Sequence, residues 1–208
     1  MKYLTVLIHG LEGSRNDWFD RNGYTKGGYF TDELNAMGYP FVAYDLYGHG
    51  DWKADEPDFD PSNIDDDTYP KFVYRSAERI SELIRREVCD NGYGGINFVT
   101  YSAGCVPGVK ILERLKNIDI GQIIMCVPSP ERDYDDEFSM HNNLEVFRDR
   151  NVSIFMGMND EYIPSEDTEF FFRLLCCRYK ALYRYKSGHA LPLAWVEAGI
   201  AVLKAGCR

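Results

Sequence analysis

Three residues of the types that form a nucleophilic relay lie far apart in the chain. Ser102 stands between an apolar run and a helical pattern, Asp160 follows a second apolar run, and His189 follows Gly188 late in the chain. An activated Ser needs a general base, and the base needs a carboxylate that orients it. These residue types indicate acyl transfer through a Ser nucleophile, provided that the fold brings them together.

The surroundings of Ser102 predict a strand, an abrupt turn and a helix. Ile96, Phe98 and Val99 are β-branched or aromatic, and an apolar helical spacing runs from Val109 to Leu115. This is close to the nucleophile elbow, in which a strained turn lifts a Ser above the carboxyl edge of a parallel sheet. Thr100 stands where that pattern usually has Gly. The alternative is that Ser102 only caps the helix.

The base is chosen from four His residues. His9 and His49 lie in glycine-rich turns and His141 lies in a polar segment, whereas His189 lies between the last predicted strand and helix. In a parallel sheet the carboxyl-end loops converge on one edge, so this position favours His189 as the base. The alternative is a structural or surface His.

The orienting acid has two adjacent candidates, Asp160 and Glu161. Asp160 is preferred for its spacing from Gly157 and Pro164. Cys105 is a second conceivable nucleophile, but a small buried residue is the favoured interpretation.

Apolar runs and helical patterns alternate along the whole chain. We expect strands at 3–8, 41–44, 96–101, 120–127, 152–156 and 179–185, and helices at 31–37, 70–88, from 105 onward, near 144–148, at 165–176 and at 191–205. This alternation predicts a doubly wound, mostly parallel six-stranded sheet in a three-layer α/β/α arrangement, with residues 1–208 as a single domain.

At this point the chain resembles the α/β-hydrolase fold superfamily over nearly its whole length. The matching parts are His9-Gly10, the turn from Asp45 to Gly50, the elbow at Ser102, Asp160 with Pro164, and Gly188-His189. The resemblance implies Ser102 as nucleophile, His189 as general base and then acid, and Asp160 holding the imidazole tautomer. It also implies an oxyanion hole made by the backbone N–H groups of Leu11 and Ala103.

Composition limits the partners. Lys and Arg total 23 against 33 Asp and Glu, a net charge of −10, which argues against nucleic acid and anionic membranes. The six Cys residues form no regular framework, so we expect reduced thiols in a cytoplasmic protein. No pattern in the chain specifies an oligomeric state.

An acidic segment from Asp51 to Asp67 carries eight carboxylates and one Lys. Part of it has the alternating spacing of calcium ligands, but Asn63 replaces the turn Gly and Tyr69 the closing Glu, so we expect a solvated loop and no metal. Segments of about 51–69 and 128–150 are expected to form the rim or a small lid of the site.

The sequence therefore predicts a serine hydrolase without a cofactor, acting on an ester or thioester of a small acyl substrate. Repulsion by the acidic rim should disfavour strongly anionic substrates. Two alternatives remain: hydrolysis of an amide, lactone or carbon–carbon bond at the same residues, or a non-catalytic binding protein with this fold.

Overall fold

A six-stranded parallel sheet forms the centre of the computed structural model, which describes residues 2–55, 59–62, 64–65, 67–130 and 137–206. The strands are β1 (Tyr3–Ile8), β2 (Phe41–Tyr44), β3 (Gly95–Tyr101), β4 (Ile120–Cys126), β5 (Asn151–Gly157) and β6 (Tyr179–Tyr185). Their order across the sheet is β2-β1-β3-β4-β5-β6, and every neighbouring pair is parallel. The predicted strands are confirmed, with ends that differ by one residue at most.

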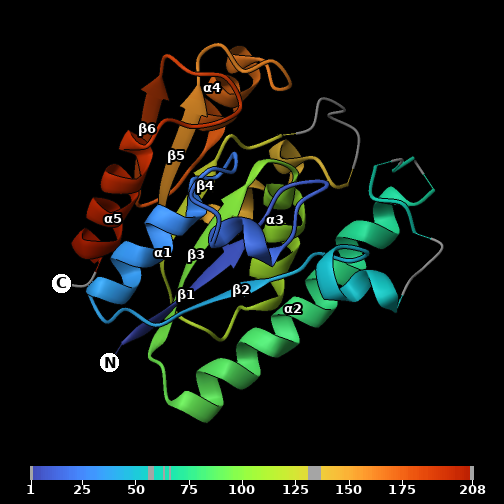
Figure 1. Ribbon diagram of the computed structural model, residues 1–208, viewed down its shortest axis with the longest axis vertical. Helices are drawn as coiled ribbons and strands as arrows, with labels where there is room; N and C mark the ends of the chain where they lie inside the picture. Colours follow the sequence, from blue (N-terminus) through green and yellow to red (C-terminus); the bar gives the residue numbers. More distant parts are fainter. Residues whose placement is uncertain (1, 56–58, 63, 66, 131–136, 207–208) are drawn as a thin grey trace.

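Helices cover both faces of the sheet (Figure 1). The α-helices are α1 (Gly27–Ala36), α2 (Tyr69–Asn91), α3 (Cys105–Arg114), α4 (Ser165–Leu174) and α5 (Ala194–Gly206). Short 3₁₀ helices are η1 (Arg15–Trp18), η2 (Gly50–Ala54), η3 (Ser102–Gly104) and η4 (Met140–Phe147). The predicted three-layer α/β/α architecture is therefore confirmed.

Two hydrophobic cores follow from this layering. One core joins α2, α3, η4 and α4 to one face of the sheet, through residues such as Ile80, Ile111 and Phe171. The other joins α1 and α5 to the opposite face, where the rings of Phe30 and Trp195 stack with centroids 5.0 Å apart. Since side chains alternate between the faces of a strand, β3 serves both cores and is buried along its whole length.

The first helix begins earlier than the sequence indicates. We expected a start at Thr31 or Asp32, but α1 begins at Gly27 after Lys26 in the left-handed conformation. A Cβ atom on Gly27 would lie 2.5 Å from the carbonyl oxygen of Asp17, so glycine is needed there for close packing. The expectation was wrong because the need for glycine at this position comes from the packing of Gly27 on Asp17, which the local sequence pattern does not reveal.

The expected rim segments are described only in part. Helix η2 (Gly50–Ala54) includes the start of the first segment, and η4 (Met140–Phe147) lies in the second. Residues 56–58, 63, 66 and 131–136 lie outside the described residues, and with them part of both expected rim segments. In the part of the chain that the structure describes, no helix has the length and apolar character needed to cross a membrane.

Candidate active site

Ser102 lies at the carboxyl end of β3, where the chain turns sharply into η3 and α3. Its φ is +52°, a left-handed conformation that is uncommon for a residue with a side chain. A Cβ atom on Gly104 would overlap the carbonyl oxygen of His9, so the turn after β1 packs directly on this turn. The close packing holds Ser102 in its strained conformation.

His189 brings the three separated residues together. Its Nε2 atom lies 2.9 Å from Ser102 Oγ, and its Nδ1 atom lies 2.9 Å from Asp160 Oδ2. The imidazole is buried, with 8% of the residue exposed. With a proton on Nδ1 donated to Asp160, the lone pair of Nε2 faces the Ser102 hydroxyl, as a general base requires.

Asp160 is an almost fully enclosed carboxylate with several donors. Its Oδ1 atom accepts hydrogen bonds from the backbone N–H groups of Tyr162 and Ile163 at 2.9 and 3.0 Å. Burial raises the pKa of this carboxyl, but the hydrogen bonds from His189, Tyr162 and Ile163 outweigh burial, so the pKa lies below its ordinary value. Asp160 therefore stays ionised beside the imidazole.

Glu161, the competing acid, contacts the backbone of the His189 loop. Its Oε2 atom accepts a hydrogen bond from the His189 backbone N–H at 3.0 Å. A Cβ atom on Gly188 would overlap this carboxylate oxygen, so Gly188 leaves room for it. The two adjacent acids thus hold two different parts of one residue, and only Asp160 contacts the ring.

Tyr101 holds the same loop from the other side. Its hydroxyl donates a hydrogen bond to the His189 carbonyl oxygen at 2.6 Å. Burial raises the pKa of this phenol, so it remains a donor. Sequence reasoning missed this contact, because residues 101 and 189 are far apart in the sequence and only the folded sheet brings them together.

The turn after β1 lies against Ser102. A Cβ atom on Gly10 would lie 3.0 Å from Ser102 Cβ, so the backbone at Gly10 packs closely on Ser102. Ala103 is the second residue of η3, and the first N–H groups of a helix have no partner within it. The resemblance to the α/β-hydrolases implies that the N–H groups of Leu11 and Ala103 form an oxyanion hole, and this stays a prediction.

His9 has a structural role in that turn. Its Nδ1 atom lies 2.6 Å from the Gly10 carbonyl oxygen, and its Nε2 atom accepts the Leu46 N–H at 3.0 Å. Burial lowers the pKa of His9 to about 3, which keeps the ring neutral. The ring therefore ties the turn after β1 to the turn after β2.

The other two His residues lie away from the relay. The ring of His49 packs beside that of His9, with ring centroids 5.2 Å apart, and the ring of His141 packs against those of Phe170 and Phe171. Among the four His residues, only His189 contacts Ser102.

The unusual Thr100 is accommodated by the following helix. Its Oγ1 atom lies 3.0 Å from Cys105 Sγ, and a Cβ atom on Gly108 would lie 2.9 Å from Thr100 Cγ2. Gly108, one turn into α3, thus leaves the space that the Thr100 side chain occupies. Cys105 is fully buried and burial raises its pKa to about 12, which is unfavourable for a thiolate nucleophile.

Exposed aromatic residues surround His189. The rings of Tyr162 and Tyr24 lie 5.2 and 6.5 Å from the imidazole, and these residues are 66% and 58% exposed. Sequence reasoning missed both, because neither residue belongs to a recognisable motif. They offer flat, partly apolar surfaces beside the imidazole.

The comparisons with known proteins support the fold assignment. No family model and no curated protein sequence matches the chain. Solved structures do match: the protein TT1662 of Thermus thermophilus at 16% identity and a TM-score of 0.71 covers 99% of this chain and 89% of its own. The carboxylesterase of Bacillus cereus matches at 15% identity and a TM-score of 0.65, over 99% and 89% of the two chains.

A protein of Xanthomonas campestris pv. campestris, assigned as a hydrolase of the α/β superfamily, also matches. Its identity is 16% and its TM-score 0.63, over 98% of this chain and 97% of that chain. Together with the sheet order, these similarities show that the chain has the α/β-hydrolase fold. The resemblance recognised from the sequence is confirmed at the level of the fold.

Proposed function

We propose that the protein is a serine hydrolase that cleaves a carboxylic ester or thioester through a covalent acyl-enzyme. The observation that carries the proposal is the unbroken chain of contacts from Ser102 Oγ through the His189 ring to Asp160. In each contact the heavy atoms are 2.9 Å apart, within the range for proton transfer along a hydrogen bond.

In the first half of the reaction Ser102 Oγ attacks the acyl carbon while His189 Nε2 takes its proton. The carbonyl oxygen becomes an oxyanion, which the N–H groups of Leu11 and Ala103 would stabilise. The imidazolium, held by Asp160, then donates its proton to the leaving oxygen or sulfur as that bond breaks. In the second half water repeats these steps, with His189 as base, and releases the acid.

The surroundings of the relay favour neutral or cationic substrates. Asp160 and Glu161 both lie at the base, and the exposed rings of Tyr24 and Tyr162 flank it. Aromatic faces attract apolar groups and cations, whereas carboxylates repel anions. Free coenzyme A esters, which are strongly anionic, should therefore be poorer substrates than neutral esters.

Replacement of Ser102 tests the proposal directly. Ser102→Ala should abolish turnover of a p-nitrophenyl ester and labelling by a fluorophosphonate, because no oxygen remains to be acylated. Cys105→Ser is the matched control three residues away, and it should keep both activity and labelling. Labelling of Ser102→Ala, or loss of labelling in both Ser102→Ala and Cys105→Ser, would refute the assignment of Ser102. A folded wild-type protein that resists every serine-directed probe would favour the non-catalytic alternative.

A further inference from the structure

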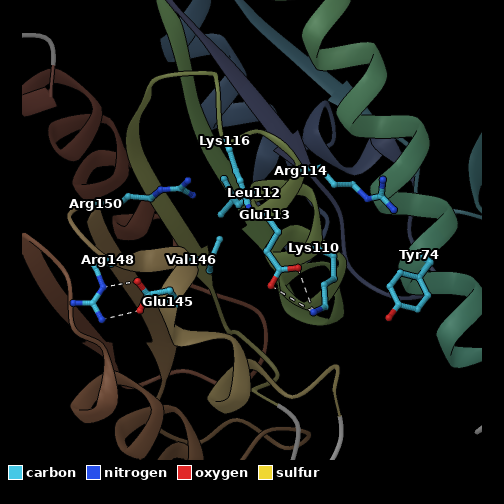
Figure 2. A pocket seen from close by; sticks show the side chains of 10 residues that line it. All are labelled: Tyr74, Lys110, Leu112, Glu113, Arg114, Lys116, Glu145, Val146, Arg148 and Arg150. Atoms are coloured by element: carbon cyan, nitrogen blue, oxygen red, sulfur yellow. Dashed lines mark hydrogen bonds and ion pairs between the residues drawn. The ribbon is translucent and has the colours of Figure 1, made fainter.

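A basic groove lies along α3, away from Ser102 (Figure 2). Its hollow has a volume of about 540 Å³, which is within the range of small-molecule sites. Five basic and two acidic residues line it, in a chain with a net charge of −10. The basic residues are Lys110, Arg114, Lys116, Arg148 and Arg150.

The groove lies toward the edge of the sheet opposite the relay. Helix α3 starts beside Ser102 and ends at Arg114, and Arg150 directly precedes β5. In a parallel sheet the amino ends of the strands lie on the edge opposite the carboxyl ends, where Asp160 and His189 are found. The groove is thus separate from the candidate active site.

Two of the five cations are neutralised within the groove. Lys110 Nζ lies 3.3 Å from a Glu113 carboxylate oxygen and 2.8 Å from the Asn143 side-chain oxygen. Arg148 forms a two-pronged pair with Glu145, at 2.5 and 2.7 Å, as Figure 2 shows. These two pairs use both acidic residues that line the groove.

The other three cations have no such partner. Among the described residues, no carboxylate or other acceptor is recorded for the charged groups of Arg114, Lys116 and Arg150. In Figure 2, Arg150 extends from the start of β5 toward the part of α3 that carries Leu112, and Lys116 extends toward the same place. The positive charge of the groove is therefore concentrated on these residues.

Arg150 is the most informative of the three. Its Nη1 atom is buried and has no hydrogen-bond partner among the described residues. Burial lowers the pKa of this guanidinium, as expected for a cation that is desolvated without compensation. Its backbone is fixed, because its N–H donates to the Phe147 carbonyl at 3.1 Å and its carbonyl accepts the Arg178 N–H at 2.9 Å.

The end of α3 accounts for only part of this charge. Cations such as Arg114 and Lys116 are favourable near a helix C-terminus, where the backbone carbonyls carry partial negative charge. Arg150 does not belong to that helix, and a desolvated donor without a partner is unfavourable for the free protein. In Figure 2 the Arg114 side chain extends away from Arg150, whereas Lys116 extends toward the same part of α3 as Arg150, so an anion in the groove would pair with Arg150 and Lys116.

We propose that this groove binds a small polyanion, a molecule with phosphate or clustered carboxylate groups that pairs with Arg150 and Lys116. A planar guanidinium binds either group with two parallel hydrogen bonds. Leu112 and Val146, which also line the groove, offer an apolar wall for the uncharged part of the ligand. The volume of the hollow limits the ligand to a small molecule.

Calorimetric titration with inorganic pyrophosphate and with citrate at low ionic strength tests the proposal. We expect saturable binding of at least one of them, weakened by added salt. Lys116→Gln should weaken binding about tenfold and Arg150→Met about thirtyfold or more, since a charge-assisted hydrogen bond is lost in each. Tighter binding of pyrophosphate assigns the ligand to the phosphates, and tighter binding of citrate to the polycarboxylates.

Lys204→Gln is the matched control, because Lys204 is an exposed cation on α5, over the other face of the sheet. It should bind the probe as the wild type does. The proposal is overturned if neither anion binds saturably, or if Lys116→Gln and Lys204→Gln bind equally well. Because Lys116 is exposed, its variant gives this answer even if Arg150→Met does not fold.

Discussion

Strand β5 carries an ion at each end, and the two ions differ in how they are satisfied. Asp160 follows the strand and accepts hydrogen bonds from one imidazole and two backbone N–H groups. Arg150 precedes the strand and has a buried nitrogen atom without a partner among the described residues. Both side chains are desolvated, but only the carboxylate is compensated within the fold.

The contrast separates two kinds of polar site. Asp160 is fully paired inside the protein, so its partners fix the geometry of the carboxylate in advance, as the proposed reaction requires. A charge that is desolvated and unpaired costs stability until a ligand pairs with it. Removing the first should damage activity, and removing the second should damage only binding at its own groove.

Asp160→Asn should have the largest effect. Asparagine keeps the shape, but its amide favours the wrong imidazole tautomer, so kcat should fall by about 10⁴-fold. Glu161→Gln is the matched control: it keeps an oxygen for the His189 N–H, and kcat should fall by about tenfold or less. Steady-state ester hydrolysis measures both. Equal losses in the two variants would mean that the acids share the role that we assign to Asp160.

His9 extends the comparison to a buried group that is satisfied only while neutral. The pKa of His9 is about 3 in the folded state against 6.5 in the unfolded chain. As the pH falls, the unfolded chain therefore binds the extra proton before the folded protein does. The free energy of unfolding should fall as the pH drops below 6.5, by about 1.4 kcal/mol per pH unit from this residue. His49, whose pKa burial also lowers, adds to the same trend.

Urea unfolding at several pH values between about pH 7 and pH 5, above the range in which carboxylates titrate, measures this slope. His9→Gln should be less stable at neutral pH but should show a shallower slope. Parallel curves for the two proteins would show that His9 is not protonated selectively in the unfolded chain.

Arg150→Met should have the smallest effect on the free protein. Methionine keeps much of the aliphatic length and removes the desolvated charge, so the free energy of unfolding should be unchanged or higher by up to about 1 kcal/mol. Thermal unfolding without and with pyrophosphate measures it: the variant should lose the ligand-induced rise in Tm that the wild type shows. A large loss of stability without ligand would mean that Arg150 is already compensated inside the fold.

Much of the fold could be predicted from the sequence, because alternating apolar runs and helical patterns reflect local rules. The proximity of Ser102, Asp160 and His189 was also predictable, since each follows a strand of one parallel sheet. Contacts between loops were not. The hydrogen bond of Tyr101 to the His189 carbonyl depends on three-dimensional packing that leaves no periodic signal.

Two residues show why local rules failed. Thr100 looked like a departure from the elbow pattern, but Gly108, eight positions later, provides the space that it occupies. Arg150 belongs to no motif in the sequence, and its buried nitrogen without a partner among the described residues emerges only from the packing of α3 and η4 around it. In both cases the meaning of a residue is set by a neighbour that is distant in sequence.

The two hydrogen bonds to the backbone of His189 have a consequence for the timing of the proposed reaction. Glu161 holds its N–H and Tyr101 holds its carbonyl, so the peptide units on both sides of the residue are tethered. The imidazole can then move only about its own side-chain bonds, on the picosecond-to-nanosecond scale of rotamer motion. Passing the proton from the attacking oxygen to the leaving group would thus need no slower rearrangement of the loop, and turnover would not wait for this part of the protein.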